Sequence, residues 1–324
     1  MDREGNTAVY IPACTCEELL KNQFGSAAHA AHSSDSPGSP HESFIVVMAT
    51  HGHTAEAAEA LGALGRAGST SATALGSIVF IDEIDSEREQ TEQALSGLPG
   101  VRRFLYGNGD VYWSRALRAL LDEALGVGAD FIIHVNTDVL VTAPIDVLLA
   151  PMRLDGRVAA VAGRLTGDVP ITGYRPVHAW FPFFRMVKPG RDAAILPASY
   201  VVYRASALRS GAVDLAALDE YRHGWADVEL SYQLRERGNR LATSSDVVGI
   251  VEHKRYFRRT HQFDRYGGSF LRYVLECPTA PCFADTKRIG IRLFGRFWPV
   301  MLRVYVPVGL HWVRYRLRRL KPDQ

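Results

Sequence analysis

The chain has 324 residues, of which 47% are hydrophobic and 22% are charged, so it is a folded protein large enough to bury a core in one or two domains. The formal net charge of +2 excludes a general electrostatic reason to bind nucleic acid. The N-terminus has no positive segment followed by an apolar run and a small-residue cleavage site, which predicts a cytoplasmic location.

Residues 1–43 are predicted to form an appendage that ends in a low-complexity linker. The four cysteines form two close pairs, Cys14 with Cys16 and Cys277 with Cys282. Together they could form a four-thiolate zinc site, although neither spacing is the usual C-x2-C. Reduced, partly buried thiols are the alternative.

From Phe44 onward the sequence alternates between strand and helix patterns. The predicted strands are 44–49, 77–81, 101–106 and 130–136, and the predicted helices between them are 54–64, 86–95 and 111–125. This βαβ alternation predicts a mostly parallel sheet with helices on both faces. Ligands bind such sheets at the carboxyl ends of the strands, so the polar clusters that follow the strands are expected to converge there. These clusters are 50–53, 82–83, 107–110 and 136–138.

The pattern is looser after Asp138. Apolar runs at 158–162, 179–184 and 199–203 predict further strands between Gly and Pro turns. A helix is predicted from Trp225 to about Gly238, with acids in its first turn, arginines in its last turn and glycine at its end. A final strand over 247–251 leads to His253.

In this order the motifs resemble nucleotide-sugar glycosyltransferases of the GT-A fold, in particular glycosyltransferase family 2 with its rhamnosyltransferase-like members. The resemblance covers residues 44–265 and is carried by Thr50-His51, Asp82 with Asp85, Asn108 to Asp110, Asn136-Thr137-Asp138, the helix start Ala226 to Leu230, and His253. It implies an α/β GT-A (Rossmann-like) domain with a nucleotide-binding half (44–140) and an acceptor half (141–265). A helical, basic segment follows over 266–324.

A divalent cation, Mn²⁺ or Mg²⁺, is the expected cofactor. It would clamp the donor diphosphate and neutralise the leaving group. Asp138 is the predicted metal ligand, and the resemblance adds His253, whose imidazole mildly favours Mn²⁺. Asn136 offers only a neutral carbonyl, so the diphosphate itself must supply much of the coordination. A strand-end aspartate that merely caps a turn is the alternative for Asp138.

Inverting transfer needs a general base that takes the proton of the acceptor hydroxyl. Asp227 is the predicted base, because the helix dipole favours its charged form and should keep it ionised at neutral pH. A structural N-cap is the alternative role for Asp227. Glu229 is expected to support the geometry of the loop before the helix.

The nucleotide donor is expected to lie against the strand ends. Asp82 and Glu83 would accept hydrogen bonds from the base or ribose, as an acid after a second strand does in dinucleotide folds. The resemblance adds Thr50, His51, Asn108, Gly109 and Ser199 to the donor-binding set, and small side chains near Ser199 would permit close approach of the sugar.

The segment 287–321 contains no acidic residue, whereas arginines and large apolar residues recur along it. This composition predicts a peripheral helix at the anionic inner face of the membrane. Packing against the catalytic domain or within a homodimer is the alternative.

The predicted function is transfer of a sugar to a hydroxyl of a glycan, lipid-linked or small-molecule acceptor. The sequence leaves two other functions open. One is a nucleotidyltransferase, although no Gly-rich loop with a lysine occurs between Phe44 and Arg66. The other is a catalytically silent nucleotide-sugar-binding or scaffold protein. Asn136 and Ala226 favour this alternative because they depart from the family pattern.

Overall fold

The computed structural model describes residues 42–109, 111–167, 172–178, 181–209, 211, 213–221 and 226–251. The cysteine pairs, His253, the basic segment and nearly all of the predicted appendage lie outside the described residues. Among the described residues, no helix combines the length and the apolar character needed to cross a bilayer.

Strands and helices alternate in the first half of the described chain. They are β1 (Glu42–Thr50), α2 (Thr54–Ala67), β2 (Ala72–Ile81), α3 (Asp85–Ser96), β3 (Val101–Tyr106), α4 (Tyr112–Val127) and β4 (Phe131–Val135). The second half contains β5 (Val139–Val141), α5 (Asp146–Leu154), β6 (Val158–Gly167), β7 (Tyr174–His178), β8 (Phe181–Met186), β9 (Asp192–Ala193), β10 (Tyr200–Arg204), α6 (Ala205–Arg209), the 3-10 helix η1 (Leu215–Glu220), α7 (Ala226–Glu236) and β11 (Arg240–Val251).

One central sheet joins strands from both halves, in the order β3-β2-β1-β4-β10-β6-β11-β5, and β9 pairs with β11. Strands β3, β2, β1 and β4 are parallel. Strand β10 is antiparallel to both of its neighbours, and β11 is parallel to β6 but antiparallel to β5. The predicted α/β class is therefore confirmed, with a sheet that is parallel in its first half and mixed beyond β4.

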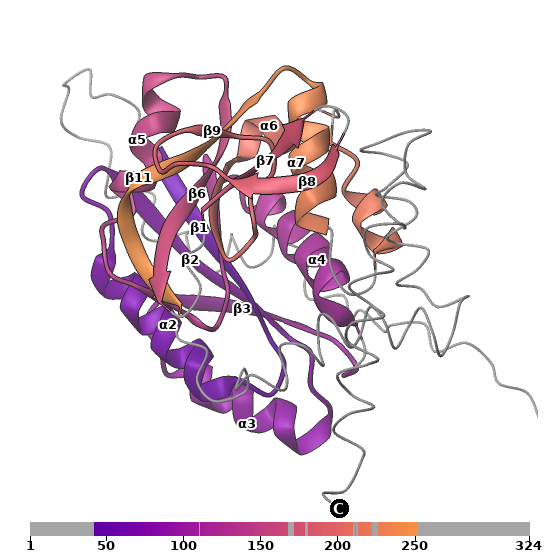
Figure 1. Cartoon of the computed structure of the whole chain (residues 1–324). Coiled ribbons are helices and arrows are strands. Elements are labelled where there is room, and N and C mark those ends of the chain that lie inside the picture. Colours follow the sequence, from indigo (N-terminus) through magenta and orange to yellow (C-terminus); the bar gives the residue numbers. More distant parts are fainter. Residues whose placement is uncertain are drawn as a thin grey trace, which may run out of the picture.

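Two apolar cores cover the two faces of the sheet. Figure 1 shows α2 and α3 on one side and α4 and α7 on the other. Successive residues of β1 point to opposite faces, so Ile45 belongs to the core that includes α4 and α7, whereas Val46 belongs to the core that includes α2 and α5. All five residues of β4 are buried, as expected for a strand that is covered on both faces.

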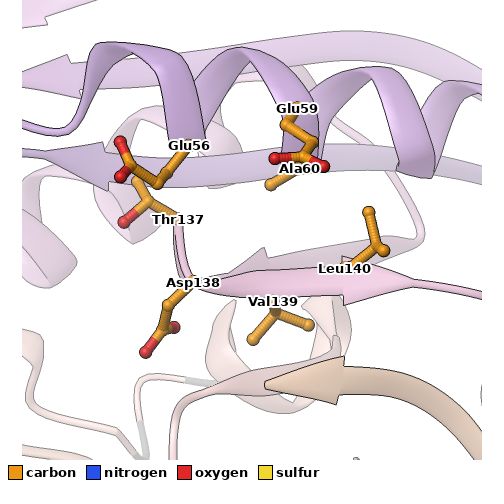
Figure 2. Close-up of a pocket in the computed structure, with 7 residues that line it drawn as sticks. All are labelled: Glu56, Glu59, Ala60, Thr137, Asp138, Val139 and Leu140. Carbon is orange, nitrogen blue, oxygen red and sulfur yellow. The ribbon is translucent and has the colours of Figure 1, made fainter. Parts of the chain in front are cut away.

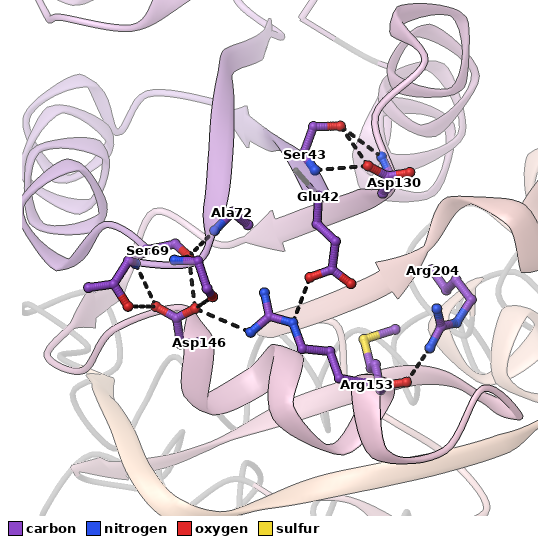
Figure 3. A network of polar contacts seen from close by, with 11 residues as sticks. Glu42, Ser43, Ser69, Ala72, Asp130, Asp146, Arg153 and Arg204 are labelled. Atoms are coloured by element: carbon purple, nitrogen blue, oxygen red, sulfur yellow. Dashed lines mark hydrogen bonds and ion pairs between the residues drawn. The ribbon is translucent and has the colours of Figure 1, made fainter. Parts of the chain in front are cut away.

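A polar network braces the start of β1 and the helix α5 (Figure 3). Arg153 of α5 donates to Glu42 at 2.6 Å and also contacts Asp146 at 3.4 Å. Burial alone would raise the pKa of Asp146, but hydrogen bonds from Ser71 and Thr70, among others, lower it to about 2. The network therefore ties α5 to β1 and to the α2–β2 connection. It lies at the amino ends of β1 and β2, away from the carboxyl ends of the parallel strands.

Candidate functional site

The polar residues after β1, β2 and β3 lie side by side at the carboxyl edge of the sheet. In the strand register, Thr50 pairs with Ile81, and Ile81 pairs with Tyr106. The pairing continues one residue further, because the amide of Asp82 donates to the Thr50 carbonyl at 3.0 Å. The amide of Gly107 donates to the Ile81 carbonyl at 2.8 Å. The structure thus brings the first three predicted clusters together.

Asp82 organises the loop between β3 and α4. Its carboxylate accepts a hydrogen bond from the amide of Gly109 at 2.9 Å and another from the amide of Val111 at 3.1 Å. Gly109 has a φ of +82°, a left-handed conformation that glycine adopts readily. Asn108 lies within this loop. The predicted contact of Asp82 with the nucleotide stays a prediction, but bracing this loop is a role that sequence reasoning did not assign to it.

Glu83 and His51 brace the loop that follows β1. One carboxylate oxygen of Glu83 accepts from the amide of Gly52 at 2.8 Å, and the other accepts from the Thr91 hydroxyl at 2.5 Å. The Nδ1 atom of His51 lies 2.5 Å from the Asp82 carbonyl oxygen, while its side chain remains 61% exposed. The two acids after β2 therefore order the loop after β1 on one side and the loop after β3 on the other.

The segment Asn136-Thr137-Asp138 connects β4 to β5, and Thr137 and Asp138 line a pocket against α2 (Figure 2). Glu56 and Glu59 of α2 line the same pocket. Figure 2 shows Thr137 beside Glu56, whereas the carboxylate of Asp138 points away from α2. The two glutamates make the α2 side of this pocket unfavourable for an anionic group.

The end of β11 lies beside Asp138. Val251 pairs with Val139, the residue that follows Asp138. Gly167 makes room for this strand end, since a Cβ at position 167 would lie 2.2 Å from the Val251 carbonyl oxygen. The predicted ligand His253 comes two residues later and lies outside the described residues. Within the described ranges, no group of three or more His, Cys, Asp or Glu side chains is arranged to hold a metal ion.

Asp138 is one hard oxygen donor at a strand end, and its predicted role as a metal ligand stays a prediction. A closed, protein-only metal site needs more ligands than the described residues bring together here.

Asp227 is in the first turn of α7, as expected, and is half-buried. Its carboxylate accepts hydrogen bonds from the amide of Ala198 at 3.3 Å and from the amide of Val228 at 2.9 Å. Burial among protein atoms nevertheless raises the pKa of Asp227, and these amides oppose the rise only in part. The pKa therefore moves in the direction opposite to the one predicted from the helix dipole, because desolvation of the charge outweighs it.

A short backbone path links the two predicted acids. The amide of Asn136, two residues before Asp138, donates to the Ser199 carbonyl at 2.8 Å. The adjacent residue, Ala198, donates its amide to Asp227. The register explains this proximity, because β10 starts at Tyr200 opposite Val135, the last residue of β4. Ser199 thus lies between the loop that carries Asp138 and the helix that carries Asp227.

Buried polar contacts fix α7 from two sides. Glu229 accepts from the Tyr221 hydroxyl and from the Gln233 amide, each at 3.0 Å. Ser231 accepts from the amide of Leu196 at 3.0 Å. The support expected from Glu229 agrees with these contacts, whereas Ser231 was not singled out from the sequence. The only sequence signal for Ser231 is its spacing of four residues from Asp227, which places both on one face of the helix.

A scan of protein-family models finds none that matches the chain. The chain is 30% identical over 139 residues to the pre-mycofactocin glycosyltransferase of Mycobacterium tuberculosis, in strains CDC 1551 / Oshkosh and ATCC 25618 / H37Rv. The match covers 39% of this chain and 28% of each relative, so the chain spans less than a third of the relatives' length. This similarity confirms the resemblance to glycosyltransferases and does not single out family 2.

The chain is also similar to a solved structure, described as the crystal structure of GalNAc-T7 with UDP, GalNAc and Mn²⁺. The two chains are 11% identical, with a TM-score of 0.47, and the match covers 66% of this chain and 44% of that one.

Proposed function

We propose that the protein is a cation-dependent, inverting glycosyltransferase that moves a sugar from a nucleotide-diphosphate donor to an acceptor hydroxyl. The observation that carries the proposal is the backbone path through Ala198 and Ser199, which brings the Asp138 loop and Asp227 to one edge of the sheet. The identity to a glycosyltransferase over 139 residues supports the same chemistry.

Asp138, with His253 as the second predicted ligand, would hold a divalent cation against the donor diphosphate. When bound, this cation supplies positive charge that stabilises the departing nucleoside diphosphate. The protein contributes the position of Asp138, fixed between β4 and β5 with its carboxylate directed away from the acids of α2. The cation and the diphosphate would then meet on the side of the sheet edge that lies away from those acids.

Asp227 would accept the proton of the acceptor hydroxyl as the oxygen attacks the anomeric carbon. The carbon–oxygen bond to the diphosphate breaks as the new glycosidic bond forms, so the anomeric configuration inverts. A carboxylate whose pKa is raised by burial is a stronger base than an exposed one. Burial of Asp227 therefore serves the proposed role, at the cost of a less stable charged form.

The donor nucleotide would lie against the loops after β1, β2 and β3. Their acids already order these loops, so the side chains of His51 and Asn108 would face the nucleotide. Thr50, which was also predicted to bind the donor, is only 3% exposed and its hydroxyl is buried. Ser199 would contact the sugar from the β10 side. The acceptor is then a glycan, lipid-linked or small-molecule hydroxyl that reaches Asp227 from the second half of the domain.

A catalytically silent donor-binding protein is the second candidate. It is favoured by Asn136 at a position where the family pattern offers an acid, because one carboxylate fewer weakens cation binding. The two candidates predict the same ligand and differ only in turnover.

The decisive experiment is a thermal-shift screen of the full chain with nucleoside diphosphates, with and without Mn²⁺. We expect one nucleoside diphosphate to raise the melting temperature in a Mn²⁺-dependent way, because a ligand that binds the native state stabilises it. The matching nucleotide sugar should then be consumed when acceptors are supplied. Stabilisation without any turnover would favour the silent protein, and no stabilisation by any nucleotide would overturn both candidates.

A further inference from the structure

Two amides of the segment 196–199 are bound by two side chains on one face of α7. The amide of Leu196 donates to the hydroxyl oxygen of Ser231 at 3.0 Å, and the amide of Ala198 donates to the carboxylate of Asp227 at 3.3 Å. Two side chains four residues apart on α7 therefore bind two amides that lie two residues apart in one segment.

The burial of Ser231 indicates what its hydroxyl does. The residue is only 4% exposed and lies inside a helix, where alanine would be the better helix former. Its hydroxyl oxygen accepts the hydrogen bond from the Leu196 amide. Leu196 is itself 1% exposed, so its amide would lose a hydrogen-bond partner in a buried environment if the hydroxyl were absent.

The opposite side of the same segment is held by the sheet. Ser199 accepts from the amide of Asn136, and the imidazole of His134 in β4 makes a hydrogen bond with the backbone of Ala198. His134 is 1% exposed and packs edge-on against Trp113, with ring centroids 6.2 Å apart. Displacement of Ala198 is therefore limited by β4 on one side and by α7 on the other.

We propose that Ser231 is a positioning residue for Asp227: it holds the Leu196 amide and thereby keeps the Ala198 amide on the Asp227 carboxylate. The proposal rests on the proposed role of Asp227 as the base. Ser231 touches neither donor nor acceptor and acts only through the segment 196–199. Its loss should leave α7 folded while it loosens the bond between Ala198 and Asp227.

The test compares Ser231→Ala with Ser231→Thr, which retains the hydroxyl, and with Ser114→Ala as a matched control. Ser114 is a buried helical serine in α4 whose hydroxyl has no hydrogen-bond partner among the described residues. Ser231→Cys, close in size and a weak acceptor, serves as a second variant. The first readout is amide hydrogen exchange at Ala198. We expect exchange to be about tenfold faster in Ser231→Ala, intermediate in Ser231→Cys, and close to the natural rate in Ser231→Thr and Ser114→Ala.

The second readout is the titration of the Asp227 carboxyl carbon by NMR, assigned with Asp227→Asn. Loss of a hydrogen bond to the charged form should move the titration of Asp227 to higher pH in Ser231→Ala, and Ser231→Thr should restore it. Tyr174 and Tyr203 are the neighbouring titratable groups that respond to Asp227. Burial raises the pKa of both tyrosines above their ordinary value, so neither titrates in the range where Asp227 is followed.

The proposal is overturned if Ser231→Ala and Ser114→Ala have the same Ala198 exchange rate and the same Asp227 titration. Both readouts are independent of transferase activity. If the protein transferred no sugar but Ser231→Ala still changed the Ala198 exchange and the Asp227 titration, the positioning contact would be supported and the proposed function would be wrong.

Discussion

The carboxylate of Asp82 occupies the space that a side chain at Gly107 would need. A Cβ at position 107 would lie 2.1 Å from Oδ1 of Asp82, which is closer than any real contact. The same oxygen accepts from the Gly109 amide, so the glycine, the acid and the loop form one unit. Glycine at 107 is therefore required by close packing against an acid from the neighbouring strand rather than by an unusual φ angle.

Gly107→Ala should destabilise the protein by about 1–3 kcal/mol, because the methyl group must displace the Asp82 carboxylate from its buried donors. The matched control is Gly97→Ala at the end of α3, where a Cβ would meet no atom within 4 Å and φ is −74°. Urea unfolding of both variants measures the difference. Equal stability of the two variants would show that the loop can move away from Asp82 without cost.

Asp227→Asn should lower the transfer rate by about 10²–10⁴-fold, since an amide cannot accept the hydroxyl proton. Donor-dependent stabilisation should remain, because the role proposed for Asp227 concerns the acceptor and not the donor. Asp246→Asn, an exposed acid before the last part of β11, should transfer at the natural rate. If Asp227→Asn also transferred at that rate, Asp227 would not be the base.

The pH profile should reflect the raised pKa of Asp227. The base must be ionised, so kcat/KM falls as the pH is lowered through its pKa. Burial raises that pKa, and the decline should therefore begin at a higher pH than for an ordinary aspartate. A rate that stays constant down to the ordinary carboxyl range would contradict the assignment.

Asp138→Ala should abolish most of the extra thermal stabilisation that Mn²⁺ gives to the nucleoside diphosphate complex, because the cation loses its carboxylate ligand. Glu56→Gln is the matched control: Glu56 lines the same pocket from α2, whereas the Asp138 carboxylate points away from that helix (Figure 2). Melting curves with and without Mn²⁺ compare the two variants. Similar losses in both would place the cation on the α2 side.

The strands and helices of the first half of the fold were predictable, because the spacing of apolar residues along the sequence follows the spacing of buried positions. The predicted strand 101–106 coincides with β3, and the predicted helix 54–64 lies within α2. In such βαβ units the central strands are buried on both faces, as β4 is here, so apolar runs and amphipathic helices are both visible in the sequence.

The second half was less predictable because its structure depends on side-chain contacts between distant segments. Helix α5 contains Pro151, which sequence rules treat as a helix breaker. Strand β11 begins at Arg240, seven residues before the predicted start at Val247, because Thr243 and Ser244 are polar yet buried. The hydroxyl of Thr243 donates to the carbonyl of Arg191 at 3.0 Å, a contact that no local pattern reveals.

The candidate site likewise has features that local sequence patterns predict and features that depend on long-range contacts. The positions of Asp138 after a strand and of Asp227 at a helix start follow from local patterns. The link between them depends on β10 pairing antiparallel with β4, a long-range contact. For this reason the hydrogen bonds that join the segment 196–199 to Ser231 and Asp227 could not be inferred from the sequence.

His134 should make the protein sensitive to mild acid. Burial lowers the pKa of its imidazole from 6.5 to about 4, although the hydrogen bond with Ala198 partly opposes this. Between these pH values the unfolded chain binds a proton that the folded chain does not, so stability falls as the pH decreases. The full effect is about 3 kcal/mol, and at about pH 5 roughly 2 kcal/mol of it should be present.

His134→Leu should remove this dependence, so the variant should lose about 2 kcal/mol less than the natural protein when the pH falls from about 7.5 to about 5. His51→Leu is the control, because the His51 side chain is 61% exposed. Urea unfolding of the three proteins at the two pH values gives the six free energies that are needed. If His134→Leu lost as much stability in acid as His51→Leu, the His134 imidazole would have to accept a proton inside the fold, and a neutral hydrogen-bonding role beside Ala198 would be wrong.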